Sequence, residues 1–204
     1  MLRTRAAILA LIAVAGFASA PVMAQDNSFK FFVTANWISP LAEEDVDFAG
    51  IEDAIQGSDE FGYEAGFEWR LNKIIGIEGS YMLGSNNFEL GSTDIGELDQ
   101  QTITAALNVH ILPTTFFDLW IAPVASWYTF DDIDTPGDTV EVGSEWGYGA
   151  AVGFDIGFGK TFAITGGVRY IKLDVTGDTS GGDIDVGIDP LIARAGIAFR
   201  FGSR

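Results

Sequence analysis

Hydrophobic and polar residues alternate one by one along most of the chain after residue 24. Between Phe61 and Trp69 every odd residue is apolar or aromatic, whereas the even ones are glycine or glutamate. A period of two predicts a β-strand, because successive side chains of a strand point to opposite sides. The alternation recurs in residues 29–37, 75–83, 102–111, 146–155, 162–170 and 193–201. Residues 116–130 are apolar on both faces, which predicts an eighth strand without fixing its phase.

The segments between these strands are alternately long and short. Long polar segments cover roughly residues 39–59, 85–99, 131–144 and 174–187, and tight turns lie near residues 71–73, 113–115 and 157–161. This arrangement is typical of an up-and-down barrel in a Gram-negative outer membrane, with short periplasmic turns and long external loops. Closure also removes the edges that an open sheet would expose. The sequence therefore predicts an all-β fold, an eight-stranded antiparallel up-and-down transmembrane β-barrel.

Alternation alone does not decide which face points outward, because a soluble lipocalin-like barrel has the same period with its apolar face inside. Aromatic residues on the apolar face lie eight positions apart in four strands. At about 3.3 Å per residue and a tilt of about 40°, this spacing spans roughly 20 Å, close to the ~25 Å apolar band of a membrane barrel. The other face is rich in glycine and alanine, as a narrow interior requires. The predicted aromatic girdle is Phe29, Trp37, Phe61, Trp69, Trp146, Phe154, Phe162 and Tyr170.

Residues 1–24 have the parts of a cleaved secretory signal peptide. Two arginines precede an apolar run of 13 residues, and small residues follow. That run is too short to span a membrane, which takes roughly 20 residues. Cleavage after Ala24 is favoured over cleavage after Ala20, which would leave Pro21 at the new terminus. We therefore expect residues 25–204 to form the barrel, with four long acidic external loops.

The acidic residues concentrate in the long loops. The chain has 29 Asp and Glu against 11 Lys and Arg, a formal charge of −18. The four loops hold 23 of these acids and no Lys or Arg, when they are taken as residues 39–60, 84–100, 131–145 and 174–189. A negative crown of this kind excludes nucleic acid as a partner. It also predicts that divalent cations bridge the loops to lipopolysaccharide phosphates, so that chelating Mg²⁺ and Ca²⁺ loosens the loops.

The chain has few residues that could act as catalytic groups. The chain has no cysteine and one histidine, which rules out thiolate catalysis and multi-histidine metal sites. His110 should face the interior near the periplasmic end, with Asp118 across the same turn, and a structural role is the better interpretation. Residues 132–137 faintly resemble a calcium loop, but Pro136 replaces a ligand and no glutamate closes it. The sequence predicts no enzyme, no cofactor and no bound metal.

The inward face carries balanced charge. Five acids and five bases are expected inside, and facing pairs are needed because an unpaired buried charge is costly. These residues are Glu64, Glu68, Glu78, Asp118, Asp155, Lys30, Arg70, Arg169, Arg194 and Arg200. Eight strands leave an interior about wide enough for its own side chains, which favours a plugged barrel. Against this, the small inward residues Gly147, Gly149, Ala151 and Gly153 leave room along one wall.

A narrow passage with an apolar stretch is therefore the other possibility. Phe32, Trp120 and Val124 are candidates for its apolar lining, although the open phase of residues 116–130 affects the last two. The full set of expected lumen-lining residues is Phe32, Glu64, Glu68, Glu78, Trp120, Val124, Gly149, Gly153, Arg169 and Arg194.

The C-terminal half resembles the OmpW family. The run from Val168 to Asp174, the pair Asp189-Pro190 and the end Phe199-Arg200-Phe201 resemble that family's last two strands, and residues 116–131 resemble its fifth. One departure is that three residues follow Phe201. The resemblance implies an outer-membrane barrel with a narrow, hydrophobic passage for small apolar molecules and a sideways exit into the bilayer. It also implies that the barrel-assembly machinery reads Phe199 and Phe201 as an insertion signal.

These observations lead to one functional hypothesis and one alternative. We expect a channel in the Gram-negative outer membrane that allows small hydrophobic solutes to pass without a cofactor. The alternative is a non-conducting structural or surface-interaction barrel that binds through its loops. Expected partners are outer-membrane lipid and lipopolysaccharide, small hydrophobic solutes and the barrel-assembly machinery.

Overall fold

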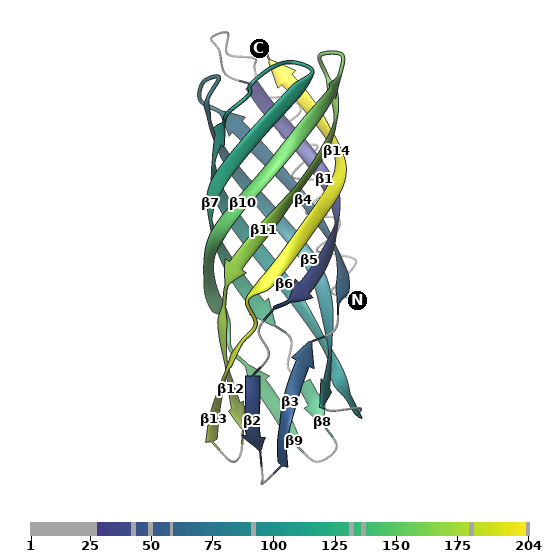
Figure 1. Ribbon diagram of the computed structural model, residues 1–204, viewed down its shortest axis with the longest axis vertical. Coiled ribbons are helices and arrows are strands. Elements are labelled where there is room, and N and C mark those ends of the chain that lie inside the picture. Colours follow the sequence, from purple (N-terminus) through teal and green to yellow (C-terminus); the bar gives the residue numbers. More distant parts are fainter. Residues whose placement is uncertain are drawn as a thin grey trace.

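A computed structural model describes residues 28–41, 44–48, 51–57, 59–90, 93–130, 133–135, 138–179 and 182–202. The predicted signal peptide and the last two residues lie outside this part of the chain. All regular elements of the described residues are strands (Figure 1). They are β1 (Ser28–Pro40), β2 (Glu44–Phe48), β3 (Ile51–Gly57), β4 (Glu60–Arg70), β5 (Ile75–Leu90), β6 (Thr93–His110), β7 (Phe117–Phe130), β8 (Ile133–Thr135), β9 (Asp138–Val142), β10 (Glu145–Phe158), β11 (Phe162–Lys172), β12 (Asp174–Thr179), β13 (Gly182–Gly187) and β14 (Pro190–Gly202).

Eight of these strands close into an antiparallel barrel, which confirms the predicted fold. The neighbours are β1, β4, β5, β6, β7, β10, β11 and β14 in that order. The barrel closes because β14 pairs with β1 along its whole length, from Ser28 opposite Gly202 to Pro40 opposite Pro190. The strands are visibly tilted against the long axis (Figure 1).

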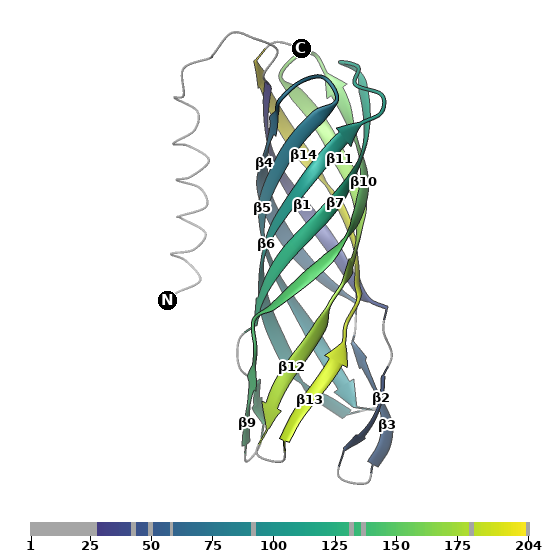
Figure 2. The same cartoon turned by 90° about the vertical axis from the view of Figure 1, so that its left-hand side faces the viewer.

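The two ends of the barrel differ. Tight turns at residues 71–74, 111–116 and 159–161 lie at one end, together with the paired ends of β1 and β14, and we call it the turn end. The opposite end carries the short strands β2, β3, β8, β9, β12 and β13, which extend beyond the barrel (Figures 1 and 2). We call it the hairpin end.

The segments that were expected to be long loops contain strands instead. Residues 85–90 and 93–99 continue β5 and β6, which pair with each other up to Leu90 opposite Thr93. Elsewhere β2 pairs with β3, β8 with β9, and β12 with β13. The reason lies in the sequence, where acids alternate with apolar residues, as in Thr139-Val140-Glu141-Val142. The high acid content of this segment concealed its period of two.

The structure fixes the phase of the fifth barrel strand. In β7 the even residues from Asp118 to Phe130 are buried, whereas the odd ones are exposed or half-buried. Trp120 and Val124 therefore lie on the inner face, and Pro123 lies on the outer face. No helix in the described part of the chain is long and apolar enough to cross a membrane.

Candidate functional site: the barrel interior

The charged residues of the inner face gather inside the barrel. All ten acids and bases expected there are buried, with exposed fractions of 6% or less. They come from seven of the eight barrel strands, all except β6. They form two groups, one toward the turn end and one toward the middle of the barrel.

The first group, the turn-end network, is built on Glu68 and Asp155. Lys30 Nζ lies 2.7 Å from Glu68 Oε2 and 3.2 Å from Asp155 Oδ2. Arg70 Nε lies 3.0 Å from Glu68 Oε1, and its guanidinium also contacts Asp118. Arg200 Nη2 lies 3.3 Å from Asp155 Oδ2. Each carboxylate thus faces at least one base, which offsets part of the cost of burying it.

His110 belongs to this network. Its Nδ1 lies 2.9 Å from Asp118 Oδ1, and its Nε2 lies 2.7 Å from Glu68 Oε1. Each ring nitrogen thus lies within hydrogen-bond distance of a carboxylate oxygen. A ring with both nitrogens engaged is not free to act as a general base. The contact with Asp118 follows from their places on either side of one turn. Sequence analysis placed Glu68 inside the barrel but missed its contact with His110, because Glu68 lies on β4, two strands away.

The second group, the mid-barrel network, joins two acids to two arginines. Arg169 Nη2 lies 3.0 Å from Glu64 Oε1, and Arg194 Nη1 lies 2.9 Å from Glu78 Oε1. Arg194 also reaches Glu64 at 3.5 Å. Asn36 donates to Glu64 and Asn108 donates to Glu78 through their side-chain amides. With these contacts the polar groups cross the interior from one wall to the other.

Two aromatic side chains lie between the networks, and we call them the aromatic layer. Phe32 and Trp120 are buried at 3% and 1% exposure. The ammonium of Lys30 lies 5.7 Å from the centre of each ring. On the mid-barrel side, the guanidinium of Arg194 lies 5.1 Å from Phe32 and 5.0 Å from Trp120. Both rings therefore receive a cation from each network, an arrangement worth about 0.5–2 kcal/mol per contact.

The space left by inward glycines is filled. A Cβ on Gly153 would lie 2.7 Å from Cε2 of Trp120, and one on Gly66 would collide with the ring of Phe32. Tyr128 and Ile171 occupy the corresponding space at Gly147. The expectation that small residues open one wall does not hold, because large side chains of neighbouring strands lie over them.

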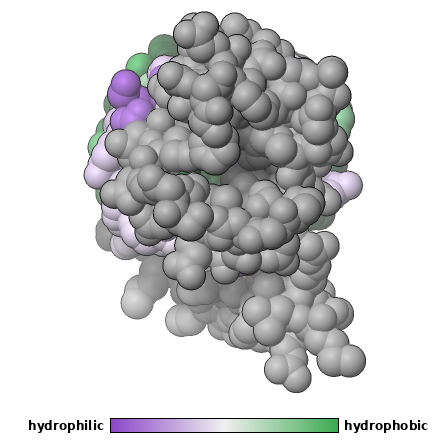
Figure 3. Space-filling view, turned by 90° about the horizontal axis from the view of Figure 1, so that it is seen from below, coloured by the Kyte–Doolittle hydropathy of each residue, from purple (hydrophilic) through white to green (hydrophobic). Residues whose placement is uncertain are grey.

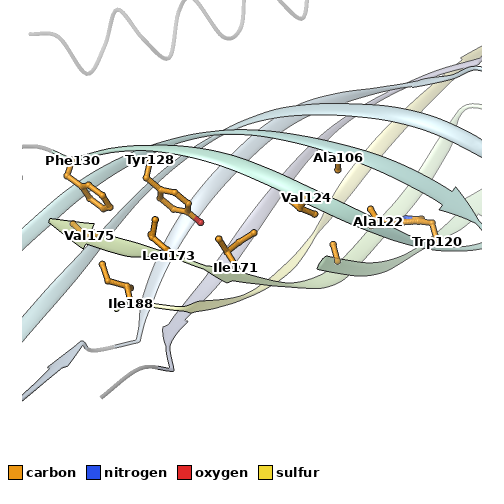
Figure 4. Packing of buried hydrophobic residues seen from close by; sticks show 11 residues of the cluster. Ala106, Trp120, Ala122, Val124, Tyr128, Phe130, Ile171, Leu173, Val175 and Ile188 are labelled. Carbon is orange, nitrogen blue, oxygen red and sulfur yellow. The ribbon is translucent and has the colours of Figure 1, made fainter. Parts of the chain in front are cut away.

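The interior becomes apolar toward the hairpin end. The buried side chains there form a continuous row that begins at Trp120 and runs along β7, β11 and β12 (Figure 4). We call its outer members the apolar lining: Tyr128, Phe130, Ile171, Leu173, Val175 and Ile188. Ile38, Met82 and Ile192 form a second buried apolar group. Charged side chains thus fill one half of the interior, and mainly apolar ones line the other, together with the uncharged polar Gln100 and Thr102, which pair with Phe130 and Tyr128.

The expected lumen residues all belong to this interior. Phe32 and Trp120 make the aromatic layer, and the five acids and bases of the set belong to the two networks. Val124 is buried between the aromatic layer and the apolar lining. Gly149 and Gly153 occupy inward positions of β10, but a Cβ on Gly149 would strike the backbone of Tyr170 rather than point into free space.

The outer face of the barrel is apolar. The residues expected in the aromatic girdle are exposed, apart from Phe162, which is half-buried. Several stack across strands, as Phe29 does on Trp69 with 6.2 Å between ring centres. Phe199 and Phe201, the expected insertion signal, also face outward. Viewed from the hairpin end, the visible edge of the wall is in part hydrophobic (Figure 3).

The pairing of the barrel wall is interrupted between β6 and β7. Between β6 and β7 the paired residues run to Ala106 opposite Val124 and resume only at Val109 opposite Ile121. Pro123 lies in the gap, and proline has no N–H to give to a ladder. Asn108 Oδ1, also in the gap, is buried and has no hydrogen-bond partner among the described residues. Small residues lie beside the gap on both faces of the wall: Ala106, Ala122 and Ala151 inside, and Ala105, Ala125 and Ala150 outside, where Leu107 is also exposed.

A closed antiparallel barrel with an apolar outer face and a polar interior is a membrane-spanning barrel. In agreement with this class, residues 10–201 match the family described as "Outer membrane protein beta-barrel domain", and the chain belongs to that family. The protein is therefore a β-barrel of the Gram-negative outer membrane.

Solved structures share this fold. OprG of Pseudomonas aeruginosa is 15% identical with a TM-score of 0.78, over 88% of this chain and 98% of that one. AlkL in lipid bilayers is 18% identical with a TM-score of 0.59, over 91% and 94%. Outer membrane protein W of E. coli is 16% identical with a TM-score of 0.58, over 88% and 100%. The resemblance to the OmpW family is thus confirmed in the fold. A comparison with curated sequences gives no match.

Among the described residues, no group of three or more His, Cys, Asp or Glu side chains could hold a metal ion. Residues 132, 136 and 137 of the faint calcium motif lie outside the described residues. The site that remains is the interior itself, with its apolar half, its charged half and the gap in the wall.

Proposed function

We propose that the protein lets small hydrophobic molecules cross the outer membrane passively. The observation that carries this proposal is the division of the interior into two halves. An apolar lining at the hairpin end offers a surface onto which an apolar solute can shed its water, which is favourable by about 25 cal/mol per Å² of apolar surface buried. No cofactor or energy source is required.

The hairpin end faces the cell exterior in this proposal. Outer-membrane barrels have short periplasmic turns and longer external connections. The hairpins also carry most of the acids, which would disfavour anionic solutes at the mouth and leave neutral ones unaffected.

A straight path to the periplasm is opposed by the packing at the turn end. An apolar solute that passed the aromatic layer would have to displace the ion pairs of the turn-end network, and breaking one buried pair costs about 3–5 kcal/mol. We infer that the solute leaves sideways instead, through the gap between β6 and β7. The gap adjoins Val124 and Ala122 inside, and Ala105, Ala125 and Ala150 lie beside it outside.

Permeation into liposomes tests the proposal. The protein should admit small apolar solutes, and exclude sugars of equal size. Leu173→Asn, which makes the apolar lining polar with a side chain of the same branched shape, should lower the apolar flux severalfold, whereas Leu173→Met should retain it. Equal and negligible flux for both kinds of solute would refute the proposal and favour a structural barrel.

The exit is tested separately. Pro123→Ala supplies an N–H with which the ladder between β6 and β7 can close, so it should slow apolar flux. Pro113→Ala, in an exposed turn, is the matched control and should have no effect. If Pro123→Ala leaves the flux unchanged while Leu173→Asn lowers it, the passage stands and the sideways exit at this gap does not.

A structural barrel is the second candidate function, because the turn-end network and the aromatic layer fill half of the interior. Under this alternative, exchange of the hairpins would alter function and substitutions in the apolar lining would not.

A further inference from the structure

Basic side chains are distributed very unevenly over the surface. Five of the basic residues after residue 24 are buried in the two networks. Lys73 and Lys160 lie on turns at the turn end. Within the described part of the chain, Lys172 is the one basic side chain exposed on the outer wall toward the hairpin end.

Lys172 faces the membrane rather than the interior. Its neighbour Ile171 is fully buried, and Lys172 is exposed, as the alternation along β11 requires. The residue opposite it in the pairing of β10 with β11 is Tyr148, which is 63% exposed. Its ammonium therefore emerges from the lipid-facing wall beside an aromatic side chain.

The aromatic residues beside Lys172 mark the depth of the membrane surface. Tyr148 stacks on Trp146 with 6.5 Å between ring centres, and Trp146 lies 5.0 Å from Trp127. Tryptophan and tyrosine gather at the level of lipid headgroups, where their polar atoms meet water and their rings meet acyl chains. A lysine at this level lies where lipid phosphates are.

No described carboxylate neutralises Lys172. It forms no salt bridge with a described residue, although Asp174 is exposed next to it on the same face. Asp189 is already engaged, since its two oxygens accept hydrogen bonds from the hydroxyl of Tyr170 at 3.0 Å and the N–H of Leu173 at 2.9 Å. These two bonds also hold the end of β11 in place. The ammonium is thus available on a fixed strand.

We propose that Lys172, with Tyr148 and Trp146, forms a site for a phosphate of lipid A in the outer leaflet. The ammonium binds the phosphate, and the stacked rings cover the first acyl groups below it. A phosphate monoester carries more charge than the diester of a phospholipid, so the site should prefer lipid A to phosphatidylglycerol. The hairpins around it are acidic and repel phosphate, which makes this lysine the favourable point of attachment on its side of the barrel.

Native mass spectrometry of the purified, refolded protein with added diphosphoryl lipid A tests the site. Lys172→Gln should weaken lipid A binding by roughly fivefold, the effect of one lysine at a lipid surface. Lys160→Gln, which removes an exposed lysine at the opposite end, is the matched control and should bind like the wild type. Lys172→Arg should retain binding.

Two further probes identify the ligand. Dephosphorylated lipid A should bind the wild type and Lys172→Gln equally. Phosphatidylglycerol should bind weakly and should lose little affinity in Lys172→Gln. The proposal is overturned if Lys172→Gln binds diphosphoryl lipid A as the wild type does, if Lys160→Gln loses as much, or if the loss is as large for phosphatidylglycerol.

Discussion

Trp120 and Gly153 lie directly opposite each other in the ladder between β7 and β10, and the indole of Trp120 occupies the space that a side chain at position 153 would need. The narrow interior at this level thus has room for the indole because position 153 has no side chain. The pairing also places Trp120 between the two networks, where its ring lies near Lys30 on one side and Arg194 on the other.

Gly153→Ala should therefore destabilise the barrel by about 1–3 kcal/mol, the usual cost of overfilling a packed core. Urea-induced unfolding in lipid vesicles, followed by tryptophan fluorescence, measures the change. Gly143→Ala is the control, because its Cβ would meet its nearest neighbour at an ordinary 3.5 Å. Combining Gly153→Ala with Trp120→Leu should cost less than the sum of the two single changes. Full additivity would show that the two side chains do not share this space.

The aromatic layer should also block the passage of ions through the barrel interior. Trp120→Ala removes the larger of its two rings and should raise single-channel conductance in planar bilayers, because water can then connect the two charged networks. Trp127→Ala is the matched control, since Trp127 lies on the same strand but on the outer face. Equal conductance of the two variants, with folding checked by heat-dependent mobility in gels, would show that other side chains close the interior.

The fold could be predicted from the sequence because its main signal is local. A period of two along one strand gives the strand and its faces, and five facing acids and five bases follow from that phase. Partner choice inside the barrel is not local. Glu68 and His110 are two strands apart, and their contact depends on the tilt and closure of the whole barrel.

Two other features could not be predicted from the alternation of apolar and polar residues. The acids of the hairpins masked their alternation, so strands were expected to be loops. Residues 116–130 are apolar on both faces, and only the structure shows that Pro123 faces outward and interrupts the pairing with β6. A proline in the middle of an expected central strand was the available signal, because proline is rare there.

Glu68 should be the most sensitive acid of the interior. It contacts Lys30, Arg70 and His110, so Glu68→Ala leaves three basic side chains without a shared partner. The expected loss is about 3–5 kcal/mol of unfolding free energy, as for other broken buried pairs. Lys160→Gln, a change of an exposed charge, should stay within about 0.5 kcal/mol. A loss below about 1 kcal/mol for Glu68→Ala in urea unfolding would mean that water replaces the carboxylate.

Asp189 should hold the junction between the barrel and the hairpin of β12 and β13. It has a φ of +42°, which few residues other than glycine, asparagine and aspartate tolerate, and it precedes a proline. The pairing of β11 with β14 ends at Tyr170 opposite Leu191, and that of β12 with β13 begins at Asp174 opposite Gly187. Between these points the carboxylate of Asp189 accepts two hydrogen bonds, from the Tyr170 hydroxyl and the Leu173 N–H, where the ladder is interrupted.

Asp189→Ala loses both bonds and gains backbone strain, so residues 171–176 should exchange their amide hydrogens faster by about tenfold or more, which corresponds to about 1.4 kcal/mol or more of local stability. Asp189→Asn keeps an oxygen acceptor and tolerates the same φ, so its exchange should stay close to that of the wild type. Hydrogen exchange measured by mass spectrometry in lipid nanodiscs resolves the two. Equal exchange in Asp189→Ala and Asp189→Asn would show that the backbone bond from Ile188 N–H to the carbonyl of Leu173, 2.9 Å long, is enough to hold the junction.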